Sequence, residues 1–299
     1  MNSTDEVTIP SPRTWRQALA AQQPLLLPIA HDALSALLIQ KAGFHAYAVG
    51  GFAVVGTRLG IPDLGLATVT EMTDAVRQMM AVCTLPVLVD ADDGYGDVKN
   101  VVRTVREYER MGVACLQIED QVSPKRCGHM AGKSVVPAPV MIAKIRAAAD
   151  ARRNPDTFLL ARTDSRAIEG LDAALHRAEA YVKAGADGLF IEAPLSRSEL
   201  EIIGRSFDVP CLANMLEGGK TPLLSPSELA ALGFAMIGYP TSLLFRIVST
   251  MQKSLTDLAH GVVRQNDDIV TFDEYKVLLG LPEWADIEDR FRKSESSDD

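Results

Sequence analysis

Short apolar runs alternate along the chain with longer segments of helical periodicity. The runs cover residues 24–30, 46–51, 86–92, 114–120, 157–163, 188–193, 210–215 and 236–241. Each has the length of a strand that is buried on both faces, as strands of parallel sheets are. Between two of the runs, Val101, Val105 and Tyr108 recur at helical steps, and Gly112 follows where a helix should end. The alternation predicts consecutive parallel βαβ units.

The number of apolar runs indicates the fold class. Eight strands separated by helices predict an α/β fold, a (β/α)8 TIM-type barrel, and such barrels reach the length of residues 1–299 as a single domain. A doubly wound open sheet is the alternative, but it typically has a glycine-rich phosphate-binding turn after its first strand. Here the first run continues into PIAHDALSA (28–36) instead.

The C-terminal region contains more predicted helix than one barrel unit requires. Residues 241–290 have a mostly helical pattern, and we expect this extension to pack on a neighbouring subunit. The chain ends, residues 1–11 and 293–299, are expected to be flexible.

Composition and charge exclude several classes of protein. The net charge is −9 and no basic stripe with interleaved aromatic residues is present, which argues against a nucleic-acid partner. No uncharged apolar stretch reaches the ~18 residues of a membrane span, and no apolar core follows a basic start, as in a secretory signal. Cys83, Cys115, Cys127 and Cys211 form no CxxC pair, as is typical of reduced thiols. We therefore expect a cytoplasmic protein without a membrane partner.

Several predicted strands end in polar residues that a buried strand does not need for packing. These are Asp90 and Asp92, Glu119 and Asp120, Arg162 and Asp164, Glu192, and Asn214, on the third to seventh runs. In a parallel barrel all of these ends open on one rim, where catalytic groups gather. The sequence therefore predicts one shared, mostly acidic site.

Three of these acids suggest a metal site. Asp90 and Asp92 are two residues apart on an extended segment, so that both carboxylates face the same way, and Glu119 lies on the next strand end. Clustered carboxylates repel one another unless a cation joins them, and an all-oxygen set suits Mg²⁺, whereas Zn²⁺ prefers His or Cys ligands. The alternative is that these acids cap helices or pair with Lys and Arg.

The segment PKRCGHMAGK (124–133) places a thiol among cationic side chains, directly after the fourth run. Neighbours such as Lys125, His129 and Lys133 favour the thiolate of Cys127 and attract carboxylates. The glycines allow the loop to fold closely over a ligand and exclude water. Alternatively, the thiol is incidental. The other three cysteines lie in or beside apolar runs and are predicted to be core residues.

Three weaker features lie near the same rim. His31 and Asp32, after the first run, either face the site or cap a helix. Gly50 and Gly51, like the segment EGGKTP (217–222), offer backbone N–H groups to a carboxylate. Tyr47 is more often a packed strand aromatic than a catalytic phenol.

The motifs together resemble a known superfamily over roughly residues 12–260. The segments are HDALSA, LGIPDLG, VDADDGYG, QIEDQVSPKRCGHMAGK, ARTD, EAP and ANMLEGGKTPL. Their order and spacing are similar to those of the isocitrate lyase/phosphoenolpyruvate mutase superfamily, and the KRCGH segment to its branch of 2-methylisocitrate and 2,3-dimethylmalate lyases. The resemblance implies a barrel with a swapped C-terminal helix, bound Mg²⁺ with Mn²⁺ as an alternative, and a homotetramer built as a dimer of dimers.

The resemblance also implies roles for individual residues. Asp90, Asp92 and Glu119 would hold the metal, Cys127 would be the acid/base at carbon, and Tyr47 would exchange the alkoxide proton. Arg162, Glu192, Asn214 and Thr221 would bind substrate, with Gly128 and His129 at its second carboxylate, Gly50 and Gly51 at the first, Lys125 on the closing loop and Asp63 near the metal.

One position departs from the pattern of the lyases. They read Tyr-x-Ser-Gly-Gly after the second strand, whereas this chain has Val49 in place of the serine that binds a substrate carboxylate. The resemblance implies a Mg²⁺-dependent lyase that cleaves a carbon–carbon bond of a 2-hydroxy di- or tricarboxylate to give a 2-oxo acid such as pyruvate. The missing hydroxyl keeps three alternatives open: an oxaloacetate decarboxylase or hydrolase, a phosphonate-forming mutase, and a non-catalytic binding protein.

Overall fold

A computed structural model describes residues 14–128, 132–264 and 269–295, and it divides the chain into two compact units. The first unit comprises Met1–Ile247 and the second Val248–Asp299. Of the two chain ends that are predicted to be flexible, residues 1–11 lie outside the described residues. At the other end, residues 293–299, the last helix extends to Glu295.

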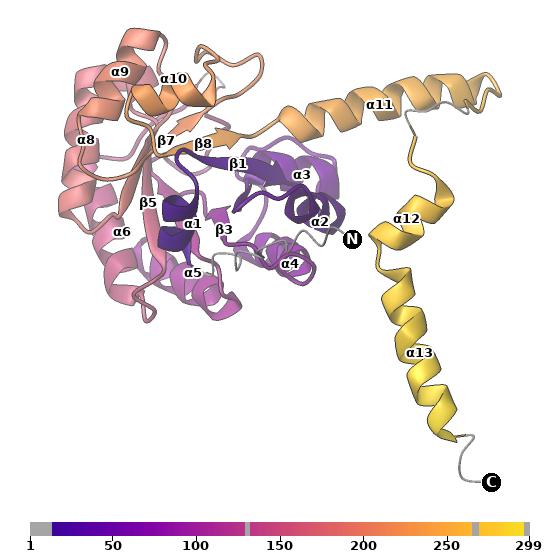
Figure 1. The fold of residues 1–299 in the computed structure, drawn as a ribbon. Coiled ribbons are helices and arrows are strands. Elements are labelled where there is room, and N and C mark those ends of the chain that lie inside the picture. Colours follow the sequence, from indigo (N-terminus) through magenta and orange to yellow (C-terminus); the bar gives the residue numbers. More distant parts are fainter. Residues whose placement is uncertain (1–13, 129–131, 265–268, 296–299) are drawn as a thin grey trace, which may run out of the picture. The chain divides into compact units, whose positions relative to one another are not determined.

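The first unit is built around a closed barrel of eight parallel strands (Figure 1). The strands are β1 (Leu25–Ala30), β2 (Tyr47–Val49), β3 (Val87–Asp90), β4 (Cys115–Glu119), β5 (Phe158–Thr163), β6 (Gly188–Ile191), β7 (Cys211–Asn214) and β8 (Met236–Tyr239). They follow one another around the barrel in sequence order, and β1 closes it by pairing with β8, with Leu25 opposite Met236. The predicted barrel is confirmed, and the open sheet is wrong.

Helices surround the strands (Figure 1). They are α1 (Trp15–Ala21), α2 (Ala33–Lys41), α3 (Gly51–Leu59), α4 (Val69–Met80), α5 (Val98–Met111), α6 (Ala138–Ala151), α7 (Arg166–Glu169), α8 (Leu171–Lys183), α9 (Arg197–Arg205) and α10 (Pro226–Ala231). In α5 the predicted stripe of Val101, Val105 and Tyr108 is buried, and Gly112 ends the helix with a φ of 87°. A left-handed residue at this point suits glycine, which has no Cβ to strain.

Two apolar layers hold the barrel. Alternate strand residues, such as Leu27, Leu88 and Phe190, form an inner cluster inside the barrel, and the residues between them pack against the helices. Helix α1 belongs to the inner cluster, because Trp15 is fully buried and lies 6.5 Å from the ring of Phe158. The amino ends of the strands are therefore covered by apolar groups, and polar residues gather at the carboxyl ends.

Side-chain caps begin several of the helices that follow the strands. The carboxylate of Asp32 accepts a hydrogen bond from the backbone N–H of Ser35 at 2.7 Å, and the Ser35 hydroxyl in turn lies 3.0 Å from the backbone N–H of Asp32. Such a cap typically contributes about 1 kcal/mol to stability. Of the two interpretations of the His31–Asp32 pair, the capping role is confirmed for Asp32.

The C-terminal helices are α11 (Ser242–Ala259), which starts in the first unit and continues into the second, α12 (Phe272–Leu278) and α13 (Leu281–Glu295). None of the described helices is both long and apolar enough to span a membrane. In the second unit, Phe272, Trp284 and Phe291 are exposed to 78%, 67% and 65%. Packing of this extension on a neighbouring subunit, and with it the helix swap, stays a prediction.

Candidate functional site

A pocket of about 460 Å³ opens at the carboxyl ends of the strands, and every strand contributes to its lining. The predicted site residues in that lining are Val49, Gly50, Gly51, Asp63, Asp90, Lys125, Cys127, Gly128, Arg162, Glu192 and Asn214. Asp92 and Glu119 lie buried directly beside it, because each is ion-paired to a cation of the lining, Lys125 or Arg162. The structure thus brings most of the predicted residues together.

Arg162 is the central cation of this site. Its Nε lies 2.9 Å from an Oδ of Asp164 and 3.2 Å from an Oε of Glu119. Its Nη atoms lie 3.6 Å from Asp90 and 3.4 Å from Glu192. Burial alone disfavours the charge, but the carboxylates, with Asp164 and Glu119 the strongest, outweigh it and raise the pKa of Arg162 well above its usual value. Arg162 therefore remains a guanidinium that joins acids from several strands.

Lys125 joins the loop after β4 to two further acids. Its Nζ lies 2.8 Å from Asp63 and 2.7 Å from Asp92, and the side chain is buried. A Cβ on Gly51 would lie 3.3 Å from this Nζ, so that glycine leaves room for the lysine. The two ion pairs hold the loop that carries Lys125 against the carboxyl ends of the strands.

The site carries more negative than positive charge. Among the described residues, six carboxylates (Asp63, Asp90, Asp92, Glu119, Asp164 and Glu192) are joined by three cations, Lys125, Lys133 and Arg162. Burial, and then the charge of Asp90, raise the pKa of Asp92 to about 7 although Lys125 opposes the shift. Burial likewise raises the pKa of Glu119 well above its usual value, and its Oε1 has no hydrogen-bond partner in the described chain.

This excess of buried carboxylate oxygen is what a hard divalent cation requires, so the residues fit a magnesium site. In the described residues no three His, Cys, Asp or Glu side chains are arranged as a ready metal-binding group. Asp90 and Glu119 instead turn to Arg162, and Asp92 turns to Lys125. Shared coordination of a metal by the three acids therefore stays a prediction.

The predicted catalytic loop lies over the pocket. Cys127 is half-buried in the pocket lining. A Cβ on Gly128 would lie 2.6 Å from Oε2 of Glu192 and even closer to Arg162, so the backbone of this residue rests directly on both side chains. The Gln121 side chain holds the loop by accepting from the backbone N–H of Arg126 at 3.0 Å and donating to its carbonyl at 2.9 Å. His129 lies outside the described residues.

Two predicted site residues do not reach the pocket. Tyr47 is fully buried in the layer between strands and helices, and the burial, followed by the neighbouring thiol of Cys83, raises the pKa of its hydroxyl far above the usual value. Tyr47 is not part of the pocket lining, and a proton-exchange role for it stays a prediction. Thr221 is buried with its hydroxyl unpartnered in the described chain, and it is not part of the pocket lining.

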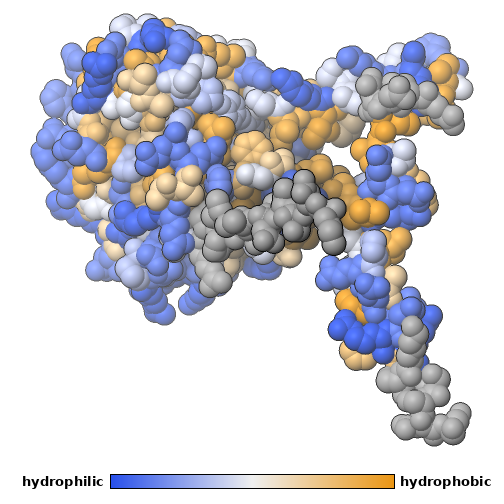
Figure 2. Space-filling model, viewed as in Figure 1, coloured by the Kyte–Doolittle hydropathy of each residue, from blue (hydrophilic) through white to orange (hydrophobic). Residues whose placement is uncertain are grey.

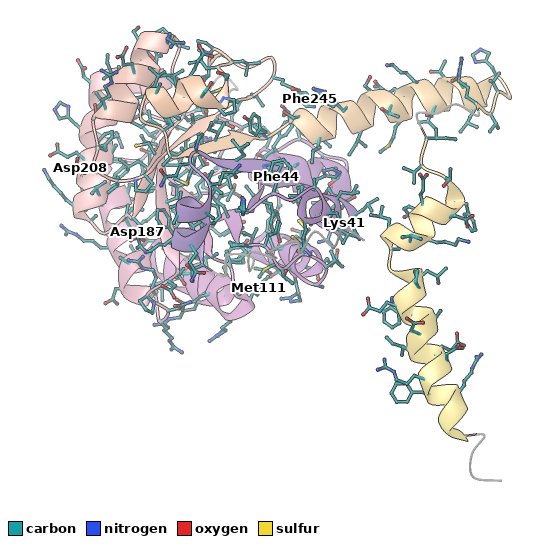
Figure 3. All side chains as sticks on the ribbon, viewed as in Figure 1. Lys41, Phe44, Met111, Asp187, Asp208 and Phe245 are labelled. Atoms are coloured by element: carbon teal, nitrogen blue, oxygen red, sulfur yellow. The ribbon has the colours of Figure 1, made fainter. Side chains whose placement is uncertain are left out.

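An apolar wall of the pocket was missed by the sequence interpretation. It is formed by Ile29, Phe52, Leu216, Pro240 and Phe245. The rings of Phe52 and Phe245 meet edge to face, with centroids 6.3 Å apart and planes at 74°, and Figure 3 shows Phe245 at the start of α11. The position of Phe52, immediately after the two glycines, is the signal that could have revealed part of this wall.

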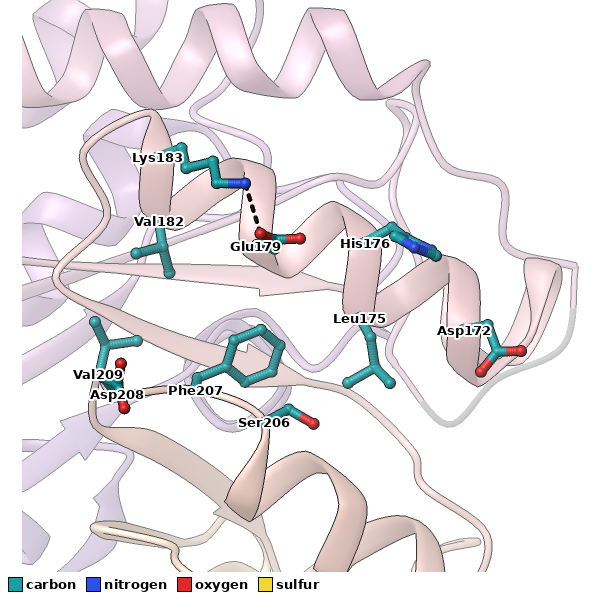
Figure 4. A pocket seen from close by; sticks show the side chains of 10 residues that line it. All are labelled: Asp172, Leu175, His176, Glu179, Val182, Lys183, Ser206, Phe207, Asp208 and Val209. Carbon is teal, nitrogen blue, oxygen red and sulfur yellow. Dashed lines mark hydrogen bonds and ion pairs between the residues drawn. The ribbon is translucent and has the colours of Figure 1, made fainter.

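A second hollow, of about 520 Å³, lies on the outside of the first unit between α8 and residues 206–209 (Figure 4). Leu175, Val182 and Phe207 form its apolar floor, and Lys183 at its edge is paired with Glu179 at 2.5 Å. None of the residues that line it belongs to the pocket at the strand ends.

Sequence comparisons identify relatives along most of the chain. The family model described as phosphoenolpyruvate phosphomutase matches residues 16–259. The chain is 43% identical to a 2,3-dimethylmalate lyase of Eubacterium barkeri, over 92% of this chain and 96% of that protein. It is 44% identical to a 2-methylisocitrate lyase of Salmonella typhimurium, over 85% and 86% of the two chains.

Solved structures have the same fold. A crystal structure of 2,3-dimethylmalate lyase, a member of the PEP mutase/isocitrate lyase superfamily, matches with a TM-score of 0.86 and 34% identity over 92% of this chain and 93% of that one. A phosphonopyruvate hydrolase in complex with oxalate and Mg²⁺ matches with a TM-score of 0.82 and 25% identity over 92% and 97%.

Proposed function

The chain belongs to the phosphoenolpyruvate mutase/isocitrate lyase superfamily, and from this premise we propose that it is a Mg²⁺-dependent carbon–carbon lyase. Its substrate would be a 2-hydroxy dicarboxylate of the 2,3-dimethylmalate type, cleaved to a 2-oxo acid such as pyruvate and a second carboxylate. The observation that carries the proposal is that the Cys127 thiol lines the same pocket as Asp90 and Arg162. A proton donor for carbon thus lines the same pocket as a cation that can bind oxygen anions and a carboxylate that can bind a metal ion.

The acidic side of the pocket supports the metal requirement. Asp90, Asp92 and Glu119 would hold Mg²⁺, since they supply only oxygen ligands and belong to a group of six carboxylates that share three cations. When bound, the ion supplies positive charge to the 2-hydroxy carboxylate and so lowers the cost of the anionic oxygen.

The residues of the chain itself would bind the remaining charges and move the proton. Arg162 and the amide of Asn214, whose Nδ2 lies 3.3 Å from Glu192, orient the substrate. Gly50 and Gly51 line the pocket beside Val49, which provides no hydroxyl, and their backbone N–H groups would bind the substrate carboxylate there. Loss of the 2-hydroxyl proton to water would leave an anionic oxygen on C2, which becomes the carbonyl of the 2-oxo acid as the bond between C2 and C3 breaks. The electron pair of that bond stays on C3, and Cys127 would protonate this carbanion of the departing carboxylate.

The apolar wall favours a dicarboxylate over a tricarboxylate substrate. Phe52, Leu216 and Phe245 offer no donor to a third carboxylate, whereas they would bury an alkyl substituent, at about 25 cal/mol for each Å² of apolar surface. Three cations stand in the same lining: Lys125 and Arg162 are each already paired with at least two acids, and Arg126 is not free either. We therefore propose 2,3-dimethylmalate rather than 2-methylisocitrate as the preferred substrate.

The test is a panel of 2-methylisocitrate, 2,3-dimethylmalate, malate and oxaloacetate, assayed for product with Mg²⁺ and after exhaustive chelation. We expect Mg²⁺-dependent release of pyruvate from dimethylmalate, and a loss of about 10²-fold or more in Cys127→Ala, since general acid catalysis contributes that much. Cys83→Ala is the matched control, because this thiol is buried outside the pocket. Full activity after chelation, or in Cys127→Ala, contradicts the proposal.

Val49 favours one second candidate, an oxaloacetate decarboxylase or hydrolase. This residue is fully buried and offers no hydroxyl where the lyases have serine, so a substrate with a smaller hydrogen-bonding requirement would be tolerated better. Turnover of oxaloacetate alone in the panel would select this candidate. Phosphorus-31 NMR with phosphoenolpyruvate tests the mutase alternative, and Mg²⁺ binding without any turnover indicates a binding protein.

A further inference from the structure

Lys133 makes two buried contacts that the proposed reaction does not require. Its Nζ lies 2.6 Å from Oδ1 of Asp164, and the two side chains are exposed to only 3% and 0%. The same Nζ donates a hydrogen bond to the backbone carbonyl of Gly128. One ammonium group thus connects the residue next to Cys127 to the end of β5.

Asp164 is a firm anchor for this contact. Its backbone N–H donates to the carboxylate of Asp120 at 2.9 Å, and its own carboxylate accepts from Nε of Arg162 at 2.9 Å. Burial disfavours its charge, but Arg162 and Lys133 prevail and lower the pKa of Asp164, so that it stays ionised. The anchor is therefore fixed on one side by the barrel and on the other by the cation that binds substrate in the proposed function.

Gly128 is the residue of the loop whose backbone lies against the charged side chains of the pocket. Its backbone rests on Arg162 and Glu192 with no room for a Cβ, and its preceding residue carries the thiol. A displacement of the Gly128 backbone would carry the adjoining Cys127 with it and move its thiol relative to the pocket. Lys133 opposes that movement, because a charged donor holds a carbonyl about twice as strongly as a neutral one.

We propose that Lys133 is a positioning residue: by bridging the Gly128 carbonyl and Asp164, it holds the Cys127 thiol in the pocket lining. Without the bridge, the segment around Cys127 lifts from the Arg162–Glu192 surface, while the barrel stays intact. The ammonium acts through the backbone of its own loop and does not touch the reacting atoms.

The rate at which iodoacetamide alkylates Cys127 tests this in the intact protein, followed by peptide mass spectrometry at about pH 9.5, above the usual thiol pKa of ~8.5. We expect Lys133→Met to raise the rate by about tenfold, as the half-buried thiol becomes accessible through local opening. Lys183→Met is the matched control, since it removes an exposed ion pair with Glu179 on α8. The buried Cys83, Cys115 and Cys211 are internal references that report general loosening.

The outcomes separate positioning from general stabilisation. A selective rise at Cys127 in Lys133→Met, with the reference thiols and the Lys183→Met variant unchanged, supports the proposal. An unchanged Cys127 rate in the folded variant, or an equal rise at all four thiols, overturns it. If Lys133→Met fails to fold, Lys133→Gln decides in the same way, because its shorter amide reaches only one of the two partners. Since no substrate is needed, the result is independent of the proposed reaction.

Discussion

At residue 128 the absence of a side chain sets how closely the loop approaches the pocket. Gly128 lies against Arg162, which Glu119 of the neighbouring strand holds, and against Glu192, which Arg162 holds in turn. A methyl group here would have to displace Arg162 or Glu192, and this costs free energy because both side chains are buried and charged. The position of the thiol is therefore coupled to the cation at the centre of the site.

Replacing Gly128 by Ala should reduce turnover while the fold is retained. The added Cβ would displace the loop or Arg162 by a fraction of an ångström or more, and misplacement of about 1 Å can cost 10²-fold in rate. We expect a fall in kcat/KM of about this size in whichever panel reaction the protein catalyses. Gly56→Ala in α3 is the control, since its Cβ would meet nothing within 4 Å. Equal activity of the two variants would show that the contact does not matter.

The directions of the side chains of β2 could not be predicted from the sequence. Tyr47 and Val49 belong to the apolar cluster that packs against the helices, whereas Ala48 between them belongs to the cluster inside the barrel. Val49, at the end of the strand, also lines the pocket. The alternation was available in the sequence, but the phase was not, because every residue of β2 is buried. A strand that is apolar on both faces gives no polar side from which to choose.

At the scale of elements, the sequence predicted most of the framework. All eight strands lie within the apolar runs, because parallel strands buried on both faces must be continuously apolar. The polar strand ends likewise meet at one rim, as the shared direction of the strands requires. The part of the apolar wall formed by Phe245 was not predictable, because this residue lies in the first turn of α11 and only the closure of the barrel by β1 and β8 brings α11 near α3.

The junction of β1 and α2 predicts a dependence of stability on pH. His31 is buried with Nδ1 unpartnered in the described chain, and burial lowers its pKa below the ordinary 6.5 although Asp32 opposes the shift. The unfolded chain therefore binds the proton more tightly, so this contribution to stability is complete above about pH 6.5 and is lost as the pH falls toward the lower, folded-state pKa.

Denaturant unfolding of the wild type and His31→Asn between pH 7.5 and 5 measures this contribution. We expect the wild type to lose stability faster on acidification, by up to ~1.4 kcal/mol per pH unit for one proton, because the asparagine side chain of the variant cannot titrate. His176→Asn, at an exposed position of α8, is the control. Parallel pH profiles for all three proteins would mean that His31 takes up its proton equally well in the folded state.

At the scale of the whole molecule, the second unit leaves large apolar side chains in water. Figure 2 shows apolar surface along the C-terminal helices, where Phe272, Trp284 and Phe291 are each more than half exposed. Large exposed apolar side chains gathered on one part of a surface often mark interaction sites in soluble proteins. We propose that a second copy of the chain covers it, within the homotetramer that the superfamily resemblance implies.

Light scattering of Trp284→Ser/Phe291→Ser decides whether this surface holds the copies together. Both substitutions lie on α13 and remove exposed apolar area without touching the strand-end pocket, so the barrel should remain folded. Buried aromatic anchors contribute about 2 kcal/mol or more each to an interface, and we therefore expect an assembled wild type and a dissociation constant raised by at least ~10²-fold in the variant. Glu283→Ser/Asp286→Ser, at exposed polar positions of the same helix, should leave the mass unchanged. A monomeric wild type would show that the copies do not assemble. Equal masses for the two double variants would show that the interface lies elsewhere.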